Sequence, residues 1–390
     1  MKTLSAISIL LAGTPLSFAQ VKGSPFGFAT GVTGGGSATP EYPQTLEELA
    51  SLLSDDKPRV IMLDKTFDFL ESEGSTTAKC CSDDRTTKCP GGTSAGQLWI
   101  QDTCDSGTRE TCTYWNAPKT PLTVGSNKSL VGVGSKGILR GKGLRLVGGV
   151  SNIIIQNIHI TELNPEFVWG GDAITLDGCD RVWIDHNKFS LIGRQMLVSG
   201  WNAAGLVTIS DNEFDGVTEW SAGCNGKHYW TMLLLGESDS YTISGNWFHD
   251  VSGRAPHLGT DYTESTILAH FVNNYFQNIG GHSFDIDTNV WLLVEGNYFE
   301  GVDTPLTADS YTKGGKIYFI QTAEDASSAA STLGYTPEVN AFSGSREVSD
   351  VVNREAIETL GQHQGSIRWK HWKPEDVPAK VQAIAGVGKV

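Results

Sequence analysis

Hydrophobic and polar residues alternate in short runs along the middle of the chain, and the same kind of run recurs. Each run is a β-branched or aromatic stretch that leads to an asparagine and then to an apolar residue. Six segments share this pattern, at residues 153–158, 182–189, 207–214, 241–248, 271–276 and 293–299. Their asparagines stand at positions 157, 187, 212, 246, 274 and 297, with gaps of 23 to 34 residues. This spacing indicates one repeated unit that carries insertions of different length.

A coil of short strands explains the pattern physically. Each strand turns apolar side chains inward and polar side chains outward, because successive side chains point to opposite faces. The asparagine is expected at the tight corner after the strand, in a left-handed conformation, bonded to its neighbours in the coils above and below. Coils roughly 4.8 Å apart then form an asparagine ladder. The pattern predicts an all-β fold, a parallel β-helix; a sandwich or a propeller, whose blades are longer and more even, is the alternative.

A coil cannot bury its apolar face alone, so both ends of the stack need covers. Thr45-Leu46-Glu47-Glu48 is a capping box, and we expect it to open a helix that runs to about Leu53. Residues 347–361 have the pattern of a second amphipathic helix, expected along the outside or at the end of the coil. The expected architecture is thus a β-helix with an N-terminal capping helix and a C-terminal helical or extended segment.

Residues 1–19 have the pattern of a secretory signal peptide. Lys2 precedes a mostly apolar stretch, and cleavage is expected after Ala19 or Gln20. The stretch is shorter than the roughly 20 residues that a membrane span requires, and Pro15 interrupts it. We therefore expect a secreted, extracellular protein with no membrane partner, in which residues 20–390 form a single catalytic β-helix domain.

Cysteine usage fits an extracellular protein. Of seven cysteines, five lie close together at positions 80, 81, 89, 104 and 112, without the paired spacing of a zinc site. Disulfides are the better interpretation, and an odd count leaves at least one thiol free. Asn127-Lys128-Ser129 is a glycosylation sequon, so a glycoprotein is expected.

The net charge of −15 excludes nucleic acid as the expected partner, because phosphate binding needs a basic surface. It also argues mildly against a strongly anionic polymer. The alternative is that the acidic surface only keeps a secreted protein soluble.

The insertions between coils hold the candidate chemistry. They contain aromatic, acidic and basic residues that could line a groove open at both ends, a shape suited to a polymer, and aromatic rings there can stack on sugar rings. The set comprises Trp169, Asp172, Arg194, Lys227, Tyr229, Trp230, Arg254 and His257. Taken singly, each has a structural explanation: the tryptophans can pack on the coil, the acid can cap a turn, and the arginines can form surface ion pairs.

Three motifs resemble a known family. Trp183-Ile184-Asp185-His186, Ile192-Gly193-Arg194-Gln195-Met196 and Ser252-Gly253-Arg254-Ala255-Pro256 are similar to motifs of the pectate lyase and pectin lyase superfamily, most of all its fungal pectin lyase branch. The resemblance covers roughly residues 22–385. It implies a right-handed, single-stranded parallel β-helix that cleaves homogalacturonan by β-elimination.

The resemblance also implies roles for individual residues. Arg254 matches the catalytic arginine that takes the proton from carbon 5 of the uronate, and Asp172 and Arg194 match the two residues beside it. Substrate contacts are expected from Trp169, Tyr229, Trp230, Lys227 and His257. At His257 the family often has lysine or arginine, so a contact from this histidine would carry a charge that depends on pH. The resemblance further pairs Cys89 with Cys224, and Cys80 or Cys81 with Cys104.

Arginine at position 194 implies chemistry without a metal. In pectate lyases this region supplies carboxylates that hold calcium, whereas a fixed guanidinium can itself stabilise charge on the substrate carbonyl. The expectation is an endo-acting, calcium-independent lyase that needs no cofactor, a monomer that acts on methyl-esterified pectin and releases 4,5-unsaturated oligogalacturonates. A free arginine has a pKa above about 12. As a base, Arg254 would need Arg194 together with Lys227 or His257 to lower that value.

Three other functions remain open from the sequence. A calcium-dependent pectate lyase would need an acidic cluster facing the groove. A hydrolase of the polygalacturonase type would need paired carboxylates, and the pair Asp55-Asp56 lies in the N-terminal cap. A non-catalytic polysaccharide-binding β-helix would share the groove but would not need Arg254.

Overall fold

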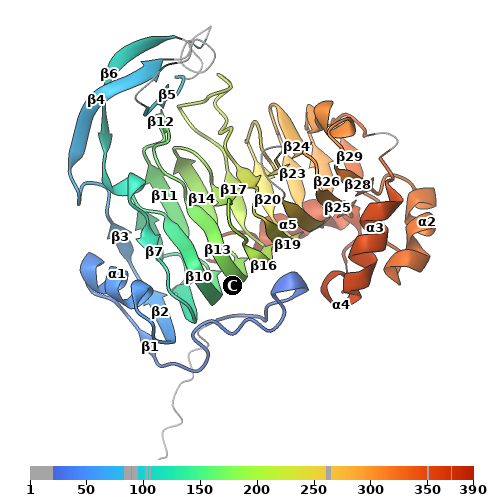
Figure 1. Cartoon of the computed structure of the whole chain (residues 1–390), viewed down its shortest axis with the longest axis horizontal. Coiled ribbons are helices and arrows are strands. Elements are labelled where there is room, and N and C mark those ends of the chain that lie inside the picture. Colours follow the sequence, from blue (N-terminus) through green and yellow to red (C-terminus); the bar gives the residue numbers. More distant parts are fainter. Residues whose placement is uncertain are drawn as a thin grey trace, which may run out of the picture.

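Parallel strands stacked in successive coils form the body of the protein, confirming the predicted β-helix (Figure 1). The computed structural model describes residues 21–82, 89, 95–101, 104, 107–260, 265–348, 351–369 and 371–390. The predicted signal peptide at residues 1–19 lies outside the described residues and stays a prediction. None of the described helices is long and apolar enough to cross a membrane.

The strands line three faces of the coil, and the long strands β10 and β13 each contribute to two of them. The first face contains β7 (Leu122–Thr123), the first halves of β10 (Leu144–Gln156) and β13 (Ile174–Asp185), β15 (Leu197–Ser199), β18 (Met232–Leu234), β21 (His257–Leu258), β24 (His282–Ile286) and β27 (Thr304–Leu306). The second contains β1 (Pro40–Glu41), β2 (Arg59–Leu63), β8 (Lys128–Gly132), the second halves of β10 and β13, β16 (Gly205–Ser210), β19 (Ser238–Ser244), β22 (Thr266–Val272), β25 (Val290–Glu295) and β28 (Lys316–Phe319). The third contains β3 (Thr66–Asp68), β9 (Ile138–Arg140), β11 (His159–Leu163), β14 (Lys188–Ile192), β17 (Glu213–Asp215), β20 (Trp247–His249), β23 (Tyr275–Gln277), β26 (Tyr298–Glu300) and β29 (Ala341–Ser343).

The predicted asparagine ladder is present at the corner between the second and third faces, with one correction. The side-chain oxygens of Asn212, Asn246, Asn274, Asn297 and Asn340 each accept from the backbone N–H and the side-chain amide of the preceding ladder asparagine, and the series starts at Asn187. Asn157 is not a member: Ile158 occupies the ladder position and donates its N–H to Asn187. Asn157 (φ 59°) has the predicted left-handed conformation, but from Asn187 to Asn297 this conformation belongs to the residue before the asparagine, as at His186 (φ 52°) and Asp211 (φ 52°).

Phenylalanines stack inside the coil two residues after each ladder asparagine. Neighbouring ring centroids from Phe189 through Phe214, Phe248, Phe276 and Phe299 to Phe342 lie 4.6–5.1 Å apart. The recurring Asn-x-Phe sequence thus has two roles at each corner. The asparagine amide bonds the backbone of the turn, and the phenylalanine ring fills the core.

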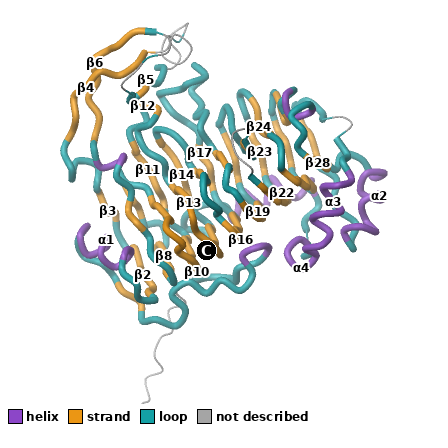
Figure 2. The backbone as a smooth tube through the Cα atoms, viewed as in Figure 1, coloured by secondary structure: helices purple, strands orange, loops and turns teal. Residues whose placement is uncertain are grey.

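Helices cover the two ends of the coil (Figure 2). Helix α1 (Leu46–Ser54) begins where predicted, and the Thr45 hydroxyl accepts from the Glu48 N–H at 3.1 Å. The capping box is only half formed, because the Glu48 carboxylate accepts from the Gln44 N–H instead of that of Thr45. Helices α2 (Ala323–Leu333), α3 (Arg354–Leu360) and α4 (Gln364–Ile367) gather at the C-terminal end, and α5 (Val377–Ile384) packs on the third face.

The predicted helix at 347–361 is wrong in its first half. Val352 forms an antiparallel bridge with Tyr318, and the Asn353 N–H donates to the Ile317 carbonyl, so this segment satisfies the edge of β28 in extended form. Helix α3 starts only at Arg354. Helix α2 was not predicted, because its Ala- and Ser-rich sequence has a weak apolar pattern, although Thr322 and Asp325 form a full capping box.

A small sheet projects from the N-terminal part of the coil. It contains β4 (Ser75–Ser82), β5 (Leu98–Trp99), β6 (Thr108–Trp115) and β12 (Phe167–Val168). Disulfides join Cys80 to Cys112, Cys81 to Cys104 and Cys89 to Cys224. The pairing of Cys89 with Cys224 and of Cys81 with Cys104 confirms the expectation, and the free thiol is the buried Cys179.

Candidate active site

Residues that precede the strands of the first face bring the candidate groups together. Asp172 lies just before Ile174, where β13 begins, and Arg194 lies just before Leu197, where β15 begins. The Asp172 carboxylate accepts from the Gln195 N–H at 2.8 Å, and its other oxygen lies 3.5 Å from Arg194 Nη1. Burial raises the pKa of Asp172 even though Arg194 and the Gln195 N–H act in the opposite direction.

Arg194 is held in place from three sides. Its guanidinium carbon lies 3.7 Å from the centre of the Trp169 ring. Its backbone N–H donates to the Gly171 carbonyl at 3.0 Å, and its own carbonyl lies 2.8 Å from His228 Nε2. Burial lowers the pKa of His228 to about 4, so this buried histidine is neutral and donates to the carbonyl. The arginine is therefore a fixed positive charge at the edge of the first face.

Arg254 lies before β21, on the far side of β18 from Arg194. Its guanidinium carbon is 4.8 Å from the centre of the Trp230 ring. Burial lowers the pKa of Arg254; the charge of Arg194 acts in the same direction, whereas Tyr229 and Asp285 favour the charged form. The direction agrees with the sequence expectation, but burial and Arg194 cause it rather than Lys227 or His257.

The predicted substrate-binding residues fall into two groups. Trp169 is 45 % exposed, and Tyr229 is half-buried beside Arg254. Trp230, in contrast, is only 8 % exposed, and its Nε1–H donates to the Gln97 side chain at 2.9 Å. Trp230 therefore supports Arg254 from the side and offers little surface to a sugar.

The two predicted basic contacts are already engaged. Lys227 Nζ donates to the carbonyl and side-chain oxygens of Asn278, both at 2.7 Å. His257 Nε2 lies 3.1 Å from Asp287, and its Nδ1 lies 3.5 Å from Asp285. His257 lies on β21 of the first face, in a local cluster of charged groups with these two acids.

His282 was missed from the sequence. Its Nε2 lies 3.3 Å from the Arg254 N–H, and its ring packs edge-on against Tyr229. Burial lowers the pKa of His282, so the neutral ring can accept this hydrogen bond. The sequence signal was weak, because His282 lies 28 residues further along and reaches Arg254 only through the stacking of coils.

A hollow of about 500 Å³ lies over the first face beside Arg194. Its lining includes Trp169, Asp172, Arg194, Val198, Trp201, Leu233 and Leu235. Outward-facing residues in register across the strands form a row along the hollow and beyond it: Arg145, Thr175, Val198, Leu233, His257 and Asp285. We call this row the groove floor; its middle is apolar and its ends are charged.

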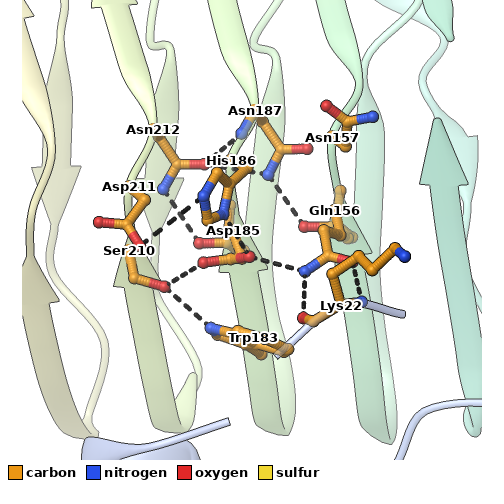
Figure 3. A network of polar contacts seen from close by, with 12 residues as sticks. Lys22, Gln156, Asn157, Trp183, Asp185, His186, Asn187, Ser210, Asp211 and Asn212 are labelled. Atoms are coloured by element: carbon orange, nitrogen blue, oxygen red, sulfur yellow. Dashed lines mark hydrogen bonds and ion pairs between the residues drawn. The ribbon is translucent and has the colours of Figure 1, made fainter. Parts of the chain in front are cut away.

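The motif at 183–186 lies elsewhere, at the corner where β13 ends (Figure 3). Asp185 accepts from Gln156, Ser210 and the His186 ring at 2.6–2.7 Å. Gln156 in turn exchanges two hydrogen bonds, both 2.8 Å, with the backbone of Lys22. Asp185 and His186 are thus a structural pair that ties the N-terminal segment to the coil.

Three groups of histidine and acidic residues in the described part of the chain have spacings that could hold a metal ion. They are Asp185, His186 and Asp211; Glu213, Asp215 and His249; and His270, Glu295 and His371. His371 lies in the C-terminal segment after α4, the other residues lie on the second or third face or at the corner between them, and none lines the hollow beside Arg194.

Comparisons with known proteins identify relatives of this chain. The family model described as pectate lyase matches residues 3–336. The chain is 62 % identical to "Probable pectin lyase F-1" of Aspergillus terreus and 60 % identical to "Probable pectin lyase E" of Aspergillus fumigatus, each over 390 residues and the full length of both proteins. A pectate lyase from Bacillus sp. N165, solved in complex with trigalacturonate, superposes with a TM-score of 0.58 at 19 % identity, over 94 % of this chain and 99 % of that one. At this identity the superposition establishes the fold alone.

Proposed function

The chain belongs to the pectate lyase family, and from this premise we propose that it is a pectin lyase that cleaves methyl-esterified homogalacturonan inside the polymer by β-elimination. The observation that carries the proposal is the pair of arginines on the first face. Burial and the charge of Arg194 lower the pKa of Arg254, which makes its neutral, basic form more accessible.

The two arginines have different roles in this reaction. Arg254 takes the proton from carbon 5, the electron pair forms the double bond between carbons 4 and 5, and the bond from carbon 4 to the glycosidic oxygen breaks. The leaving oxygen takes a proton from solvent. Arg194, oriented by Asp172, stabilises the negative charge that develops on the ester carbonyl. A fixed guanidinium supplies this charge without a metal ion.

The groove floor supports an esterified rather than a free uronate at the reacting position. Val198 on β15 and Leu233 on β18 stand in register on neighbouring strands. Both line the hollow, together with Leu235. A methyl ester is apolar and uncharged, so it contacts this surface without leaving a buried charge unpaired. The net charge of −15 also disfavours a fully de-esterified polyanion.

The three disulfides support a secreted enzyme, since such bonds persist in oxidising compartments. We propose that the chain acts outside the cell as a monomer, as a single β-helix domain after removal of residues 1–19.

The test is a spectrophotometric assay of the purified protein. Highly methyl-esterified pectin and de-esterified polygalacturonate are each supplied with chelator or with added calcium, and the ultraviolet absorbance of the unsaturated product is followed. The proposal predicts absorbance on the esterified polymer in the presence of chelator. Absorbance only on polygalacturonate with calcium would instead identify a calcium-dependent pectate lyase, and new reducing ends without absorbance would identify a hydrolase.

A further inference from the structure

The hollow beside Arg194 continues past the groups assigned to the reaction. Arg194 precedes β15, and the floor continues from Val198 on β15 through Thr175 on β13 to Arg145 on β10. Adjacent strands lie roughly 4.8 Å apart, so Arg145 is about 10 Å from Val198 along the groove. Arg145, Lys119 and Trp201 line this end of the hollow.

The aromatic ring of Trp201 is exposed to solvent. It is 54 % exposed, more than Trp169 at 45 %. The turn that carries it is tied to β13 on both sides: the Gly200 N–H donates to the Leu176 carbonyl at 3.0 Å, and Asn202 donates two hydrogen bonds to Asp177. Because the turn is held in place, little backbone entropy is lost when a ligand packs against the exposed ring, and a sugar ring has the matching apolar face.

The cations beside Trp201 lack close acidic partners within the described structure. Arg145 is half-exposed, and its ion pair with Asp177 is long, at 3.9 Å. By contrast, Arg140 pairs with Asp68 and Glu162 at 2.7 and 2.6 Å. Lys119 lies over the Tyr114 ring at 4.6 Å. Asp177, which also lines the hollow, accepts from Asn202 through Oδ1, and its Oδ2 is the oxygen 3.9 Å from Arg145.

These observations define a charge pattern along the groove. The floor is apolar at Val198 and Leu233, beside the reaction centre, and becomes cationic at Arg145. In a chain with a net charge of −15, cations left available at one end of the hollow favour an anionic ligand there.

We propose that Trp201, Arg145 and Lys119 form a subsite for an un-esterified galacturonate residue, which extends from the turn after β15 to Arg145, two strands from Val198. Trp201 packs against the sugar ring, and Arg145 with Lys119 binds the free carboxylate. The subsite rests on the proposed function and refines it: the enzyme recognises an ester at the cleaved position together with a free acid further along the same chain.

The test compares two galacturonans of equal length, one fully and one partially methyl-esterified, by kcat/KM in the absorbance assay. Wild type is expected to prefer the partially esterified polymer. Arg145→Gln removes the charge, and the preference should fall about threefold, because an exposed ion pair contributes little more. Trp201→Ala should raise KM by about tenfold on both polymers while kcat changes little.

Matched controls lie outside the hollow. Arg181→Gln removes an arginine of similar exposure, paired with Asp180 at 3.4 Å, and Tyr311→Ala removes an aromatic residue that is 49 % exposed. Both controls should keep the wild-type preference and KM. An Arg145→Gln enzyme with the wild-type preference, or a Trp201→Ala enzyme with the wild-type KM, would overturn the subsite.

Failure of the proposed function would look different. If wild type releases no unsaturated product from either polymer, the lyase assignment fails, and the subsite is then judged by titrating the protein with trigalacturonate in a calorimeter. Weaker binding by both Arg145→Gln and Trp201→Ala than by their controls supports the subsite, and equal binding overturns it.

Discussion

The backbone of Arg254 has a φ of 48°, an uncommon conformation for a residue with a long side chain. Its N–H donates to His282, and its carbonyl accepts from the Met232 N–H at 2.7 Å. The main chain therefore aims the side chain, and no described carboxylate forms a close ion pair with the guanidinium. A paired acid would stabilise the charged form and weaken the base.

Arg254→Lys tests the role of this residue as base. Lysine is a compact charge that cannot reproduce the position of the guanidinium nitrogens. We expect kcat on esterified pectin to fall about 10²- to 10⁴-fold, the range typical of a lost acid–base group, while KM changes little. A kcat within tenfold of wild type would contradict the assignment.

His282 gives the reaction a dependence on acid pH. Burial lowers the pKa of His282 below the ordinary value of about 6.5. The ring is therefore neutral at neutral pH, and its Nε2 accepts from the Arg254 backbone N–H. Protonation at lower pH removes the acceptor, and kcat should fall. A glutamine oxygen accepts at every pH, so His282→Gln should flatten the acid limb of the kcat profile. An unchanged acid limb would show that another group controls it.

The sequence predicted Asp172, Arg194 and Arg254 as site residues, because each lies in one short segment of distinctive residues. They could not identify His282 or Trp201. His282 meets Arg254 only because coils 28 residues apart stack in register, and Trp201 matters because its turn stays exposed. Conversely, Trp230 resembled a sugar-stacking residue, but the loop buries it against Gln97.

At the scale of the element, the corner between the second and third faces combines two ladders. Asn246 donates to the Ile209 and Ser244 carbonyls and to Asn274, and its oxygen accepts from Asn212. The sequence predicted this ladder because the asparagine and its apolar neighbour recur together. It did not reveal which residue turns the chain, since histidine, aspartate, glycine and asparagine all take the left-handed position.

Asn246→Ala measures how much the ladder contributes to the free energy of unfolding. The change leaves buried backbone groups on two coils without partners, so the free energy of unfolding should fall by about 3 kcal/mol. Asn340→Ala is the matched control at the end of the series, where the amide bonds only one ladder neighbour and two carbonyls. Its loss should be smaller in denaturant unfolding, and equal losses would contradict a cooperative ladder.

At the scale of the whole molecule, buried histidines make stability depend on pH. Burial lowers the pKa of His228 to about 4, and burial together with the charge of Lys188 lowers that of His159 to about 4. The unfolded chain takes up these protons near pH 6.5, before the folded chain does. Stability from these groups is complete above about pH 6.5 and is lost as the pH falls toward 4.

His228→Gln should remove part of this dependence. The wild-type shift corresponds to about 3 kcal/mol for a single buried group, and a glutamine amide can still donate to the Arg194 carbonyl without titrating. Denaturant unfolding at pH 7 and pH 4.5 should therefore show a smaller pH difference in the variant. The same difference in both proteins would contradict a neutral His228.

The sign of the charge in the groove also differs from that of the molecule as a whole. The chain is strongly acidic, yet Arg145 lies on the first face, Arg194 and Arg254 lie just before two of its strands, and the apolar Val198 and Leu233 stand in register on that face. In the proposed complex, neutral esters contact the apolar part and free acids contact the cations, which would let one groove accept a mixed polymer.

The mass of the products tests the central claim most directly. A fully methyl-esterified oligogalacturonate is incubated with wild type in the presence of chelator, and the two fragments are weighed by mass spectrometry. Elimination predicts fragments whose masses add up to that of the substrate, one of them unsaturated, and none from Arg254→Ala. Fragments that together exceed the substrate by one water, or unchanged cleavage by the variant, would contradict the account.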